Sequence, residues 1–272
     1  MASVDNKYSV LMSVYYKEKP EYLQQSIESI LNQTVPTDDF VLVCDGPLTP
    51  ELDSVIAQYP SLHVVRLKKN GGLGNALNEG MKYCQYELIA RMDSDDISRP
   101  DRCERELKIF EDHPEVDIVS GTIEEFITSP DEVYSKRVLP ETNDEIVEFA
   151  KKRNPFNHPA VMYRKSAVES AGGYKDFYLL EDYFLWIRMI QRGSQGYNIP
   201  EPVLWMRAGS DLYGRRGGWK YVESEKRLFS YMLEKGFISK GQYYRAVTSR
   251  AAGAMVPNWV RGILYKKVLR SN

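Results

Sequence analysis

The chain has 272 residues, 43% of them hydrophobic and 12% aromatic, which is enough apolar material for one large domain with a sizeable core. No apolar run approaches the ~20 residues of a membrane-spanning helix, and the N-terminal residues lack the hydrophobic segment of a secretory signal. The three cysteines are odd in number and lack the spacing of a disulfide framework or a zinc site, so we expect a reducing, cytoplasmic setting.

The formal net charge of −2 is unevenly distributed along the chain. Residues 215–272 carry 13 Lys/Arg against three Asp/Glu, a balance of +10, whereas the first 214 residues carry 23 against 35, a balance of −12. This asymmetry favours a negatively charged partner at one end of the molecule, and the alternative is pairing of the basic part with the acidic body. We expect no nucleic-acid partner.

The first 120 residues predict strands that alternate with amphipathic helices. We expect strands at residues 8–14, 40–44, 63–67, 87–92 and 116–120, and helices at residues 20–32, 50–59, 72–83 and 100–113. Near-continuous apolar strands separated by helices are typical of an α/β protein, in which helices flank both faces of a mainly parallel sheet.

Beyond residue 121 the alternation is less regular. We expect strands at 123–127, 133–138 and 160–163, helices at 142–152, 165–171 and 181–192, two short strands within 195–208, and helices from about residue 217. The sequence therefore predicts an α/β body followed by a helical C-terminal extension.

An acidic motif follows the fourth expected strand. The apolar run Leu88–Ala90 ends, and Asp93, Asp95 and Asp96 follow closely. Ligands of open α/β sheets bind at the carboxyl ends of strands, and three carboxylates this close repel each other unless a cation shares them. Mg²⁺ and Mn²⁺ prefer oxygen ligands and often bridge to phosphates. The motif thus predicts a divalent metal that holds a phosphorylated substrate, and the alternative is a solvated acidic turn that caps the next helix.

Several motifs in this order resemble the family 2 glycosyltransferases, which have the GT-A fold, a Rossmann-like sheet flanked by helices. The resemblance is closest to bacterial enzymes that build exopolysaccharide, capsule and O-antigen repeat units, and it covers about residues 7–210. The motifs are Ser13-Val14-Tyr15-Tyr16, Asp45-Gly46, Asn70-Gly71-Gly72-Leu73-Gly74-Asn75-Ala76-Leu77-Asn78, Asp93-Ser94-Asp95-Asp96, Asn157-His158-Pro159-Ala160 and Glu181-Asp182-Tyr183.

The resemblance implies a GT-A domain over residues 1–214, with a nucleotide-sugar-binding half at 1–121 and an acceptor-binding half at 122–214. A basic helical extension at 215–272 follows. The donor-binding residues it implies are Ser13, Val14, Tyr15, Asp45, Asn70, Gly74, Arg91, Asp93, Ser94 and Asp95.

Individual roles in donor binding follow from the same resemblance. Asp45 accepts a hydrogen bond from the uracil imide, with a turn-forming role as the alternative. Asp93 holds the ribose or the metal, and Asp95 ligates Mn²⁺ or Mg²⁺. Asp96 more readily caps the following loop or holds a water. Arg91 either positions the nucleotide or pairs with a carboxylate structurally.

A second pair of acids, Glu181 and Asp182, opens an expected helix, where the alternative is N-terminal capping. By resemblance Asp182 is the general base that an inverting transfer needs, and Glu181 binds the acceptor or orients the helix. His158 is expected beside the metal or the acceptor, and the alternative is a structural histidine.

The resemblance weakens after residue 205. Residues 205–216 predict a flexible basic loop that closes over the donor diphosphate, because arginine suits such groups, and the alternative is a solvated turn. The expected contacts come from Arg207, Tyr213, Arg215 and Arg216. The processive-synthase pattern Q-x-x-R-W is absent, which favours addition of a single sugar.

The C-terminal segment Pro257–Arg270 predicts a basic amphipathic helix with Trp259 at its edge. Such helices lie in the headgroup region of membranes. We therefore expect peripheral association with the inner face of the cell membrane, where a polyprenyl-diphosphate-linked saccharide acceptor would lie. The alternatives are packing on the body and pairing in a homodimer.

The sequence thus predicts an inverting, metal-dependent glycosyltransferase. It would move one hexose or N-acetylhexosamine from a UDP-sugar to a lipid-linked saccharide. One rival is a sugar-phosphate nucleotidyltransferase, which should carry a glycine-rich loop after the first strand, whereas residues 13–20 contain no glycine. The other is a non-catalytic nucleotide-binding or scaffolding protein, which would not need both groups of carboxylates.

Overall fold

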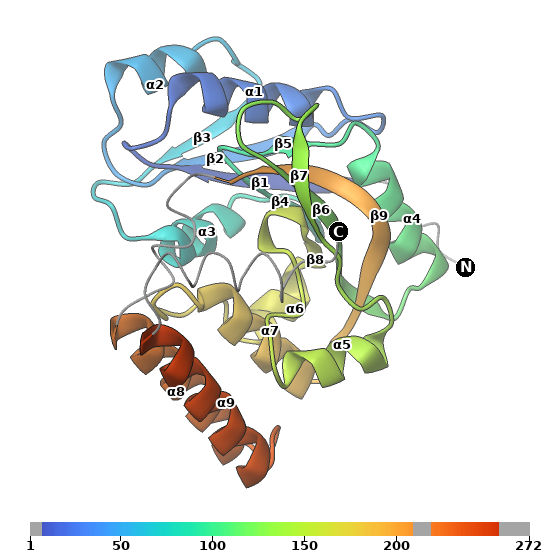
Figure 1. Cartoon of the computed structure of the whole chain (residues 1–272). Helices are drawn as coiled ribbons and strands as arrows, with labels where there is room; N and C mark the ends of the chain where they lie inside the picture. The colour runs from blue at the N-terminus through green and yellow to red at the C-terminus, as the bar shows by residue number, and fades with distance from the viewer. Residues whose placement is uncertain (1–6, 209–218, 256–272) are drawn as a thin grey trace.

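The computed structural model describes residues 7–208 and 219–255 (Figure 1). The expectations for Tyr213, Arg215, Arg216 and the C-terminal segment 257–270 lie outside the described residues. No helix among the described residues is long and apolar enough to cross a membrane.

The first half of the chain forms the parallel part of one sheet, as expected. Its strands are β1 (Tyr8–Val14), β2 (Asp39–Cys44), β3 (His63–Arg66) and β4 (Leu88–Asp93), in the order β3-β2-β1-β4. In the pairing of β1 with β4, Ser13 lies opposite Asp93. In the pairing of β1 with β2, Val14 lies opposite Cys44. The carboxyl ends of β1, β2 and β4 therefore meet at one edge, which brings their following residues together.

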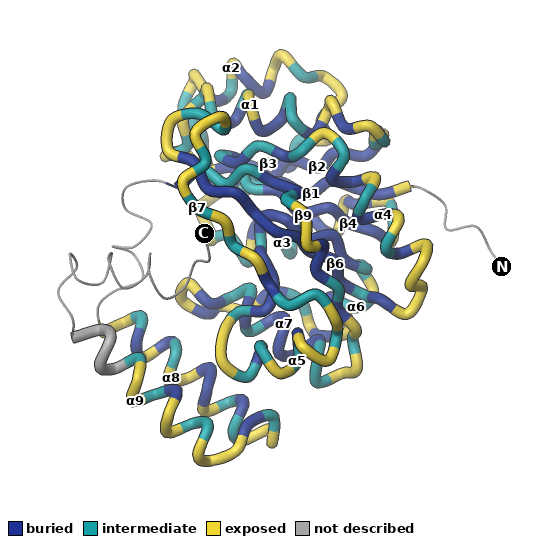
Figure 2. The backbone as a smooth tube through the Cα atoms, turned by 45° about the vertical axis from the view of Figure 1, so that its right-hand side comes forward, coloured by how far each residue is buried: buried dark blue, intermediate teal, exposed yellow. Residues whose placement is uncertain are grey.

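Helices cover both faces of this sheet because neighbouring residues of a strand point to opposite faces. Val10 and Met12 of β1 pack in a core cluster with α1 (Pro20–Leu31), α2 (Pro50–Ile56) and α4 (Arg102–Asp112). Leu11 packs in a second cluster with α3 (Leu73–Met81), α5 (Asn143–Ala150), α6 (Lys165–Ser170) and α7 (Glu181–Gln191). Figure 2 shows the buried strands between these two layers.

The second half of the chain continues the sheet in mixed directions. The strands are β5 (Ile97–Ser98), β6 (Val116–Phe126), β7 (Val133–Arg137), β8 (Met162–Arg164) and β9 (Gln195–Arg207). Strand β8 runs antiparallel to both β4 and β6, whereas β9 runs parallel to β6. The parallel arrangement expected from the first half is thus confined to β3-β2-β1-β4 and to the β6–β9 pair.

Two pairs of expected short strands are each one continuous strand. Residues 116–126 form β6 without a break, and residues 195–207 form β9 through Pro200 and Pro202. The register between β6 and β9 shifts at Thr122, which lies opposite Pro202. Irregular pairing of this kind accommodates prolines that lack an N–H group, so the prolines did not end the strand.

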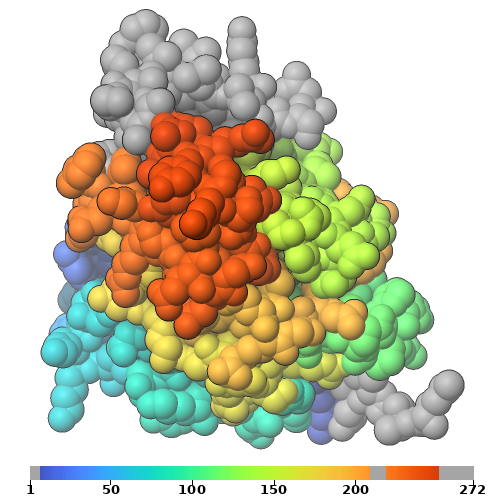
Figure 3. All heavy atoms as spheres, turned by 90° about the horizontal axis from the view of Figure 1, so that it is seen from below, coloured from blue at the N-terminus to red at the C-terminus, as the bar shows by residue number. Residues whose placement is uncertain are grey.

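The helical C-terminal part packs on the body of the molecule. Helices α8 (Trp219–Glu234) and α9 (Lys240–Met255) confirm the expected helices in this region as far as it is described. Leu228, Phe229 and Met232 form a third core cluster with Tyr183 and Ile187 of α7. Figure 3 shows the two helices lying against the yellow segments that include α7.

Candidate active site

The acidic motif forms a compact group at the carboxyl end of β4. Carboxylate oxygens of Asp93, Asp95 and Asp96 lie within 4.8 Å of one another, the only such group of three possible metal ligands in the described parts of the chain. Burial, Asp93 and Glu18 raise the pKa of Asp95 to about 7, and burial with the neighbouring acids raises the pKa of Asp96 well above its usual range. This uncompensated negative charge fits a hard divalent cation, which takes oxygen ligands.

Asp96 also fastens the end of β9 to the acidic motif. Its Oδ1 accepts a hydrogen bond of 2.8 Å from the Arg207 N–H, while Arg207 Nε donates to the carbonyl of Asp95 at 3.0 Å. The Arg207 guanidinium also donates to Gln25 Oε1 at 2.7 Å and lies 3.8 Å from the ring centroid of Tyr22. Arg207 thus lies beside the acids, and its contact with a diphosphate stays a prediction.

Glu18 belongs to this region but was not predicted from the sequence. Its carboxylate accepts hydrogen bonds from Ser94 Oγ at 2.8 Å and from the Lys19 N–H at 2.9 Å. Glu18 lies in the loop after β1, the strand next to β4. Its position in the sequence could have indicated this role, because loops that follow adjacent parallel strands meet at the same edge of the sheet.

Asp45 binds the glycine-rich loop in the structure. Its Oδ1 accepts from the Gly71 N–H at 2.7 Å and its Oδ2 from the Gly72 N–H at 3.0 Å. Gly46 has a positive φ of 88°, and a Cβ at that position would lie 2.6 Å from the backbone nitrogen of Asn70. Asp45 therefore lies at the expected edge with Ser13, Val14 and Asn70, and its contact with uracil stays a prediction.

Arg91 is almost completely buried beneath the acidic group, with an exposed fraction of 1%. It forms an ion pair with Asp93, so the structural alternative raised from the sequence is present. Its Nε and Nη1 have no hydrogen-bond partner within residues 7–208 and 219–255.

The second pair of acids faces the same region from the first turn of α7. Asp182 Oδ1 accepts from the Tyr183 N–H at 2.6 Å, and Asp182 Oδ2 accepts from Asn154 Nδ2 at 2.6 Å. Burial and the charge of Asp182 raise the pKa of Glu181 to about 7, and the charge of Asp93 adds to this rise while Arg91 opposes it.

The glycine-rich loop reaches the second pair of acids as well. A Cβ at Gly74 would lie 3.2 Å from the Cβ of Tyr174 and 3.8 Å from the Cβ of Glu181. The N-terminal turn of α3 therefore lies against Glu181. The expected donor-binding segment and the expected acceptor-side acids thus border one region.

His158 lies in an aromatic cluster with Tyr174 and Trp186. Its Nε2 is hydrogen-bonded to the Tyr174 hydroxyl at 2.9 Å, and its ring lies 5.9 Å from that of Trp186. Burial, with a contribution from the charge of Arg91, lowers the pKa of His158 well below its usual range, so the imidazole is neutral. The group of possible metal ligands consists of Asp93, Asp95 and Asp96 and does not include His158. The metal and acceptor roles of His158 stay predictions.

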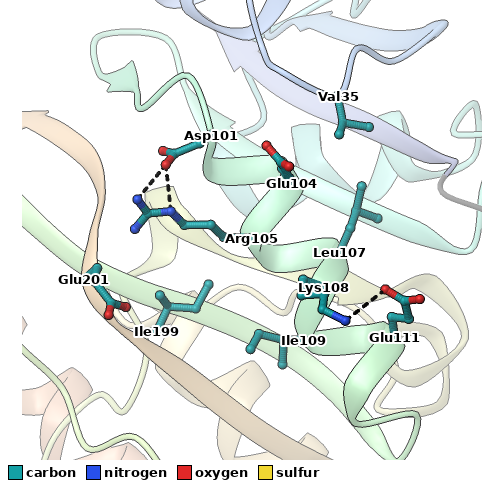
Figure 4. A pocket seen from close by; sticks show the side chains of 10 residues that line it. All are labelled: Val35, Asp101, Glu104, Arg105, Leu107, Lys108, Ile109, Glu111, Ile199 and Glu201. Carbon is teal, nitrogen blue, oxygen red and sulfur yellow. Dashed lines mark hydrogen bonds and ion pairs between the residues drawn. The ribbon is translucent and has the colours of Figure 1, made fainter.

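A groove of about 730 Å³ lies elsewhere on the molecule (Figure 4). Asp101 and residues of α4 line it together with Val35, Ile199 and Glu201. The carbonyl of Val35 accepts a hydrogen bond from Tyr8 at the start of β1, so the groove lies near the amino ends of the parallel strands. None of the predicted site residues lines it, so it is separate from the two groups of acids in the candidate site.

The sequence is similar to those of known proteins. The family model described as glycosyl transferase family 2 matches residues 9–171. The amylovoran biosynthesis glycosyltransferase AmsE of Erwinia amylovora is 41% identical, over 96% of this chain and 98% of that protein. A UDP-Gal:alpha-D-GlcNAc-diphosphoundecaprenol beta-1,3-galactosyltransferase of Escherichia coli is 38% identical, over 97% of each chain.

Solved structures share the fold at low sequence identity. A mannosyltransferase of Pyrobaculum calidifontis, in complex with GDP-Man and Mn²⁺, has a TM-score of 0.65 and 16% identity, over 94% of this chain and 72% of that one. The TarS protein of S. aureus, in complex with UDP-GlcNAc, has a TM-score of 0.68 and 15% identity, over 90% of this chain and 71% of that one.

Proposed function

The chain belongs to glycosyltransferase family 2, and we propose that it is an inverting, metal-dependent enzyme that transfers a single hexose or N-acetylhexosamine. Its donor would be a UDP-sugar and its acceptor a saccharide linked to a polyprenyl diphosphate. The observation that carries this proposal is the placement of two groups of carboxylates at one region, Asp93, Asp95 and Asp96 on one side and Glu181 and Asp182 on the other.

The acids after β4 are the proposed metal site. Asp93 and Asp95 would hold Mn²⁺ or Mg²⁺, which when bound neutralises charge on the departing diphosphate. Asp96 would serve mainly to anchor the Arg207 backbone. Arg91 would fix the orientation of Asp93 through their ion pair. The Mn²⁺ in the complex of the Pyrobaculum mannosyltransferase supports this proposal by analogy of fold.

Asp182 is the proposed general base. A carboxylate oxygen of Asp182 takes the proton from the acceptor hydroxyl as that oxygen attacks the anomeric carbon. The bond from the anomeric carbon to the UDP oxygen breaks, and UDP leaves with the electron pair. Attack occurs opposite the leaving group, so an α-linked donor gives a β-linked product. Glu181 and His158 would contact the acceptor.

The relatives support the donor and acceptor classes. The Escherichia coli relative is named for UDP-Gal, for a diphosphoundecaprenol-linked acceptor and for a beta linkage. A lipid-linked acceptor would require access to the inner membrane face, for which we propose the basic C-terminal segment. We further propose that residues 1–214 form the catalytic domain and residues 215–272 its extension.

The test is a transfer assay with a panel of UDP-sugars and GDP-mannose. The acceptor is a synthetic N-acetylglucosaminyl diphospholipid, and Mn²⁺ or EDTA is added. We expect one UDP-sugar to be consumed, a β-linked product by NMR, and loss of transfer with EDTA. Transfer from GDP-mannose alone would contradict the uridine donor, an α-linked product would contradict inversion, and full activity in EDTA would contradict the metal.

A further inference from the structure

Asn154 makes a side-chain contact with Asp182 from outside the helix that carries Asp182. Asn154 Nδ2 donates a hydrogen bond of 2.6 Å to Asp182 Oδ2, across 28 positions of sequence. The other oxygen, Oδ1, accepts from the Tyr183 N–H of α7 at 2.6 Å. Each oxygen of the carboxylate therefore has a nitrogen donor from a different segment, which restricts rotation of the group.

We propose that Asn154 is a positioning residue for the general base, holding the Asp182 carboxylate in the orientation that receives the proton of the acceptor hydroxyl. This inference rests on the proposed function of Asp182. A base must be aligned with the hydroxyl it deprotonates, and a displacement of about 1 Å can cost about 100-fold in rate. A carboxylate oxygen accepts more than one hydrogen bond, so Asp182 can still accept the proton of the acceptor hydroxyl while it is bonded to Asn154.

The contact also bears on where a proton resides in the acidic pair. Hydrogen-bond donors favour the ionised form of a carboxyl group. Asn154 and the Tyr183 N–H are two such donors to the Asp182 carboxylate. Its neighbour Glu181 has its pKa raised to about 7 by burial and by the charge of Asp182.

The loop that carries Asn154 is anchored on both sides. Before it, the carbonyl of Lys152 accepts a hydrogen bond of 2.5 Å from Arg250 of α9. After it, the carbonyl of Pro155 accepts from Asn198 Nδ2 at 3.1 Å, and Asn157 Nδ2 donates to the carbonyl of Gly121 at 2.8 Å. Because the segment on both sides of Asn154 is held by α9, β9 and β6, the position of Asn154 is set by the fold.

The test compares Asn154→Asp and Asn154→Ala with the wild-type enzyme. Asn154→Asp keeps the size of the side chain but replaces the donor with a second carboxylate, whereas Asn154→Ala removes the contact. We expect kcat to fall about 10- to 100-fold in both variants. The acid limb of the kcat/KM profile should move to higher pH, and UDP affinity by calorimetry should not change. A merely structural asparagine would not move the pH profile.

The matched control is Asn143→Ala at the start of α5. It removes an asparagine whose side-chain oxygen accepts a hydrogen bond from the Gly196 N–H of β9. This control should keep the wild-type pH profile. Asp182→Asn, tested in parallel, separates the two claims. If it abolishes transfer while both Asn154 variants keep the wild-type kcat and pH profile, the positioning role is wrong and the proposed base stands. Loss of UDP binding in the Asn154 variants would also overturn the inference, and transfer by Asp182→Asn would overturn both claims.

Discussion

Burial and the negative charges of Asp93 and Glu18 raise the pKa of Asp95, so a cation at this position would be favoured. Even the loss of a residue that merely supports a metal ligand typically costs about 10- to 100-fold in metal affinity. We therefore expect Asp95→Asn to weaken Mn²⁺-dependent UDP binding by at least that factor, measured by calorimetry with and without Mn²⁺. Asp131→Asn, in the exposed turn between β6 and β7, is the control. Equal UDP affinity in both variants would remove Asp95 from the metal site.

Glu181 predicts a pH dependence of the reaction. Burial and Asp182 raise its pKa to about 7, so Glu181 holds a proton below that pH and loses it above that pH. Ionisation of Glu181 makes Asp182 a stronger base, so kcat/KM should rise with pH through neutrality. Glu181→Gln should remove this rise, as measured by rates between pH 5.5 and 8.5. A variant that keeps the rise would show that another group titrates.

Glu181 also predicts a pH dependence of stability. Its pKa in the folded protein is above the usual value, so the folded state binds more protons between about pH 4.5 and 7. The contribution of Glu181 to the free energy of unfolding should therefore fall as the pH rises through this window. Denaturant titrations of the wild type and of Glu181→Gln at pH 5 and 8 measure it.

The residues of the candidate site were predictable where a motif stands at the end of a strand. Asp45 and the acids after β4 lie at the carboxyl edge of the sheet, as the strand pattern indicated. Glu18 and Asn154 were missed because their roles depend on contacts between segments that lie 76 and 28 positions apart in sequence. Sequence periodicity carries no information on such contacts.

At the scale of elements, the close packing of α3 on the sheet depends on Gly80. A Cβ at Gly80 would lie 2.4 Å from Leu11 Cδ1 and 2.5 Å from Val43 Cγ2, and both side chains are fully buried. We expect Gly80→Ala to lower the free energy of unfolding by about 1–3 kcal/mol, measured by denaturant titration. A Cβ at Gly241 in α9 would meet Ser239 Oγ at 3.9 Å, which is an ordinary contact distance. Gly241→Ala should therefore not lower the free energy of unfolding. Equal stability of the two variants would contradict this packing.

Helix α9 predicts an effect on the site through Arg250. Arg250 bonds both Glu225 of α8 and the carbonyl of Lys152, two residues before Asn154. Arg250→Met keeps an unbranched stem but loses these bonds, so the free energy of unfolding should fall by about 1 kcal/mol. We also expect a lower kcat at unchanged UDP affinity. Arg245→Met, at an exposed position of the same helix, should match the wild type in both assays.

Most elements were predictable because their apolar periodicity agrees with the layer they occupy. The parallel strands β1 to β4 and their helices occur where expected, with ends that differ by a few residues, as at α2, which ends at Ile56. The continuity of β6 and β9 was not predictable. Pro200 and Pro202 indicate a break locally, whereas pairing along β6 keeps the strand intact.

At the scale of the whole molecule, the site combines segments that are distant in sequence. The first group of acids follows β4 in the parallel part of the sheet. Glu181 and Asp182 begin α7, which packs on one face of that sheet. The match to the family model ends at residue 171, before the second pair of acids. Relatives that align over nearly the whole chain, such as AmsE, extend beyond it. The assignment of Asp182 therefore depends most on the structure of the second half.

The decisive measurement is made on Asp182→Asn, which preserves the size of the side chain but removes the base. UDP affinity with Mn²⁺ and the rate of sugar transfer are measured on the same preparation. The account predicts wild-type UDP affinity and a kcat about 100- to 10,000-fold lower. Transfer at the wild-type rate by this variant would contradict the account, because the two groups of carboxylates would then not act together in one reaction.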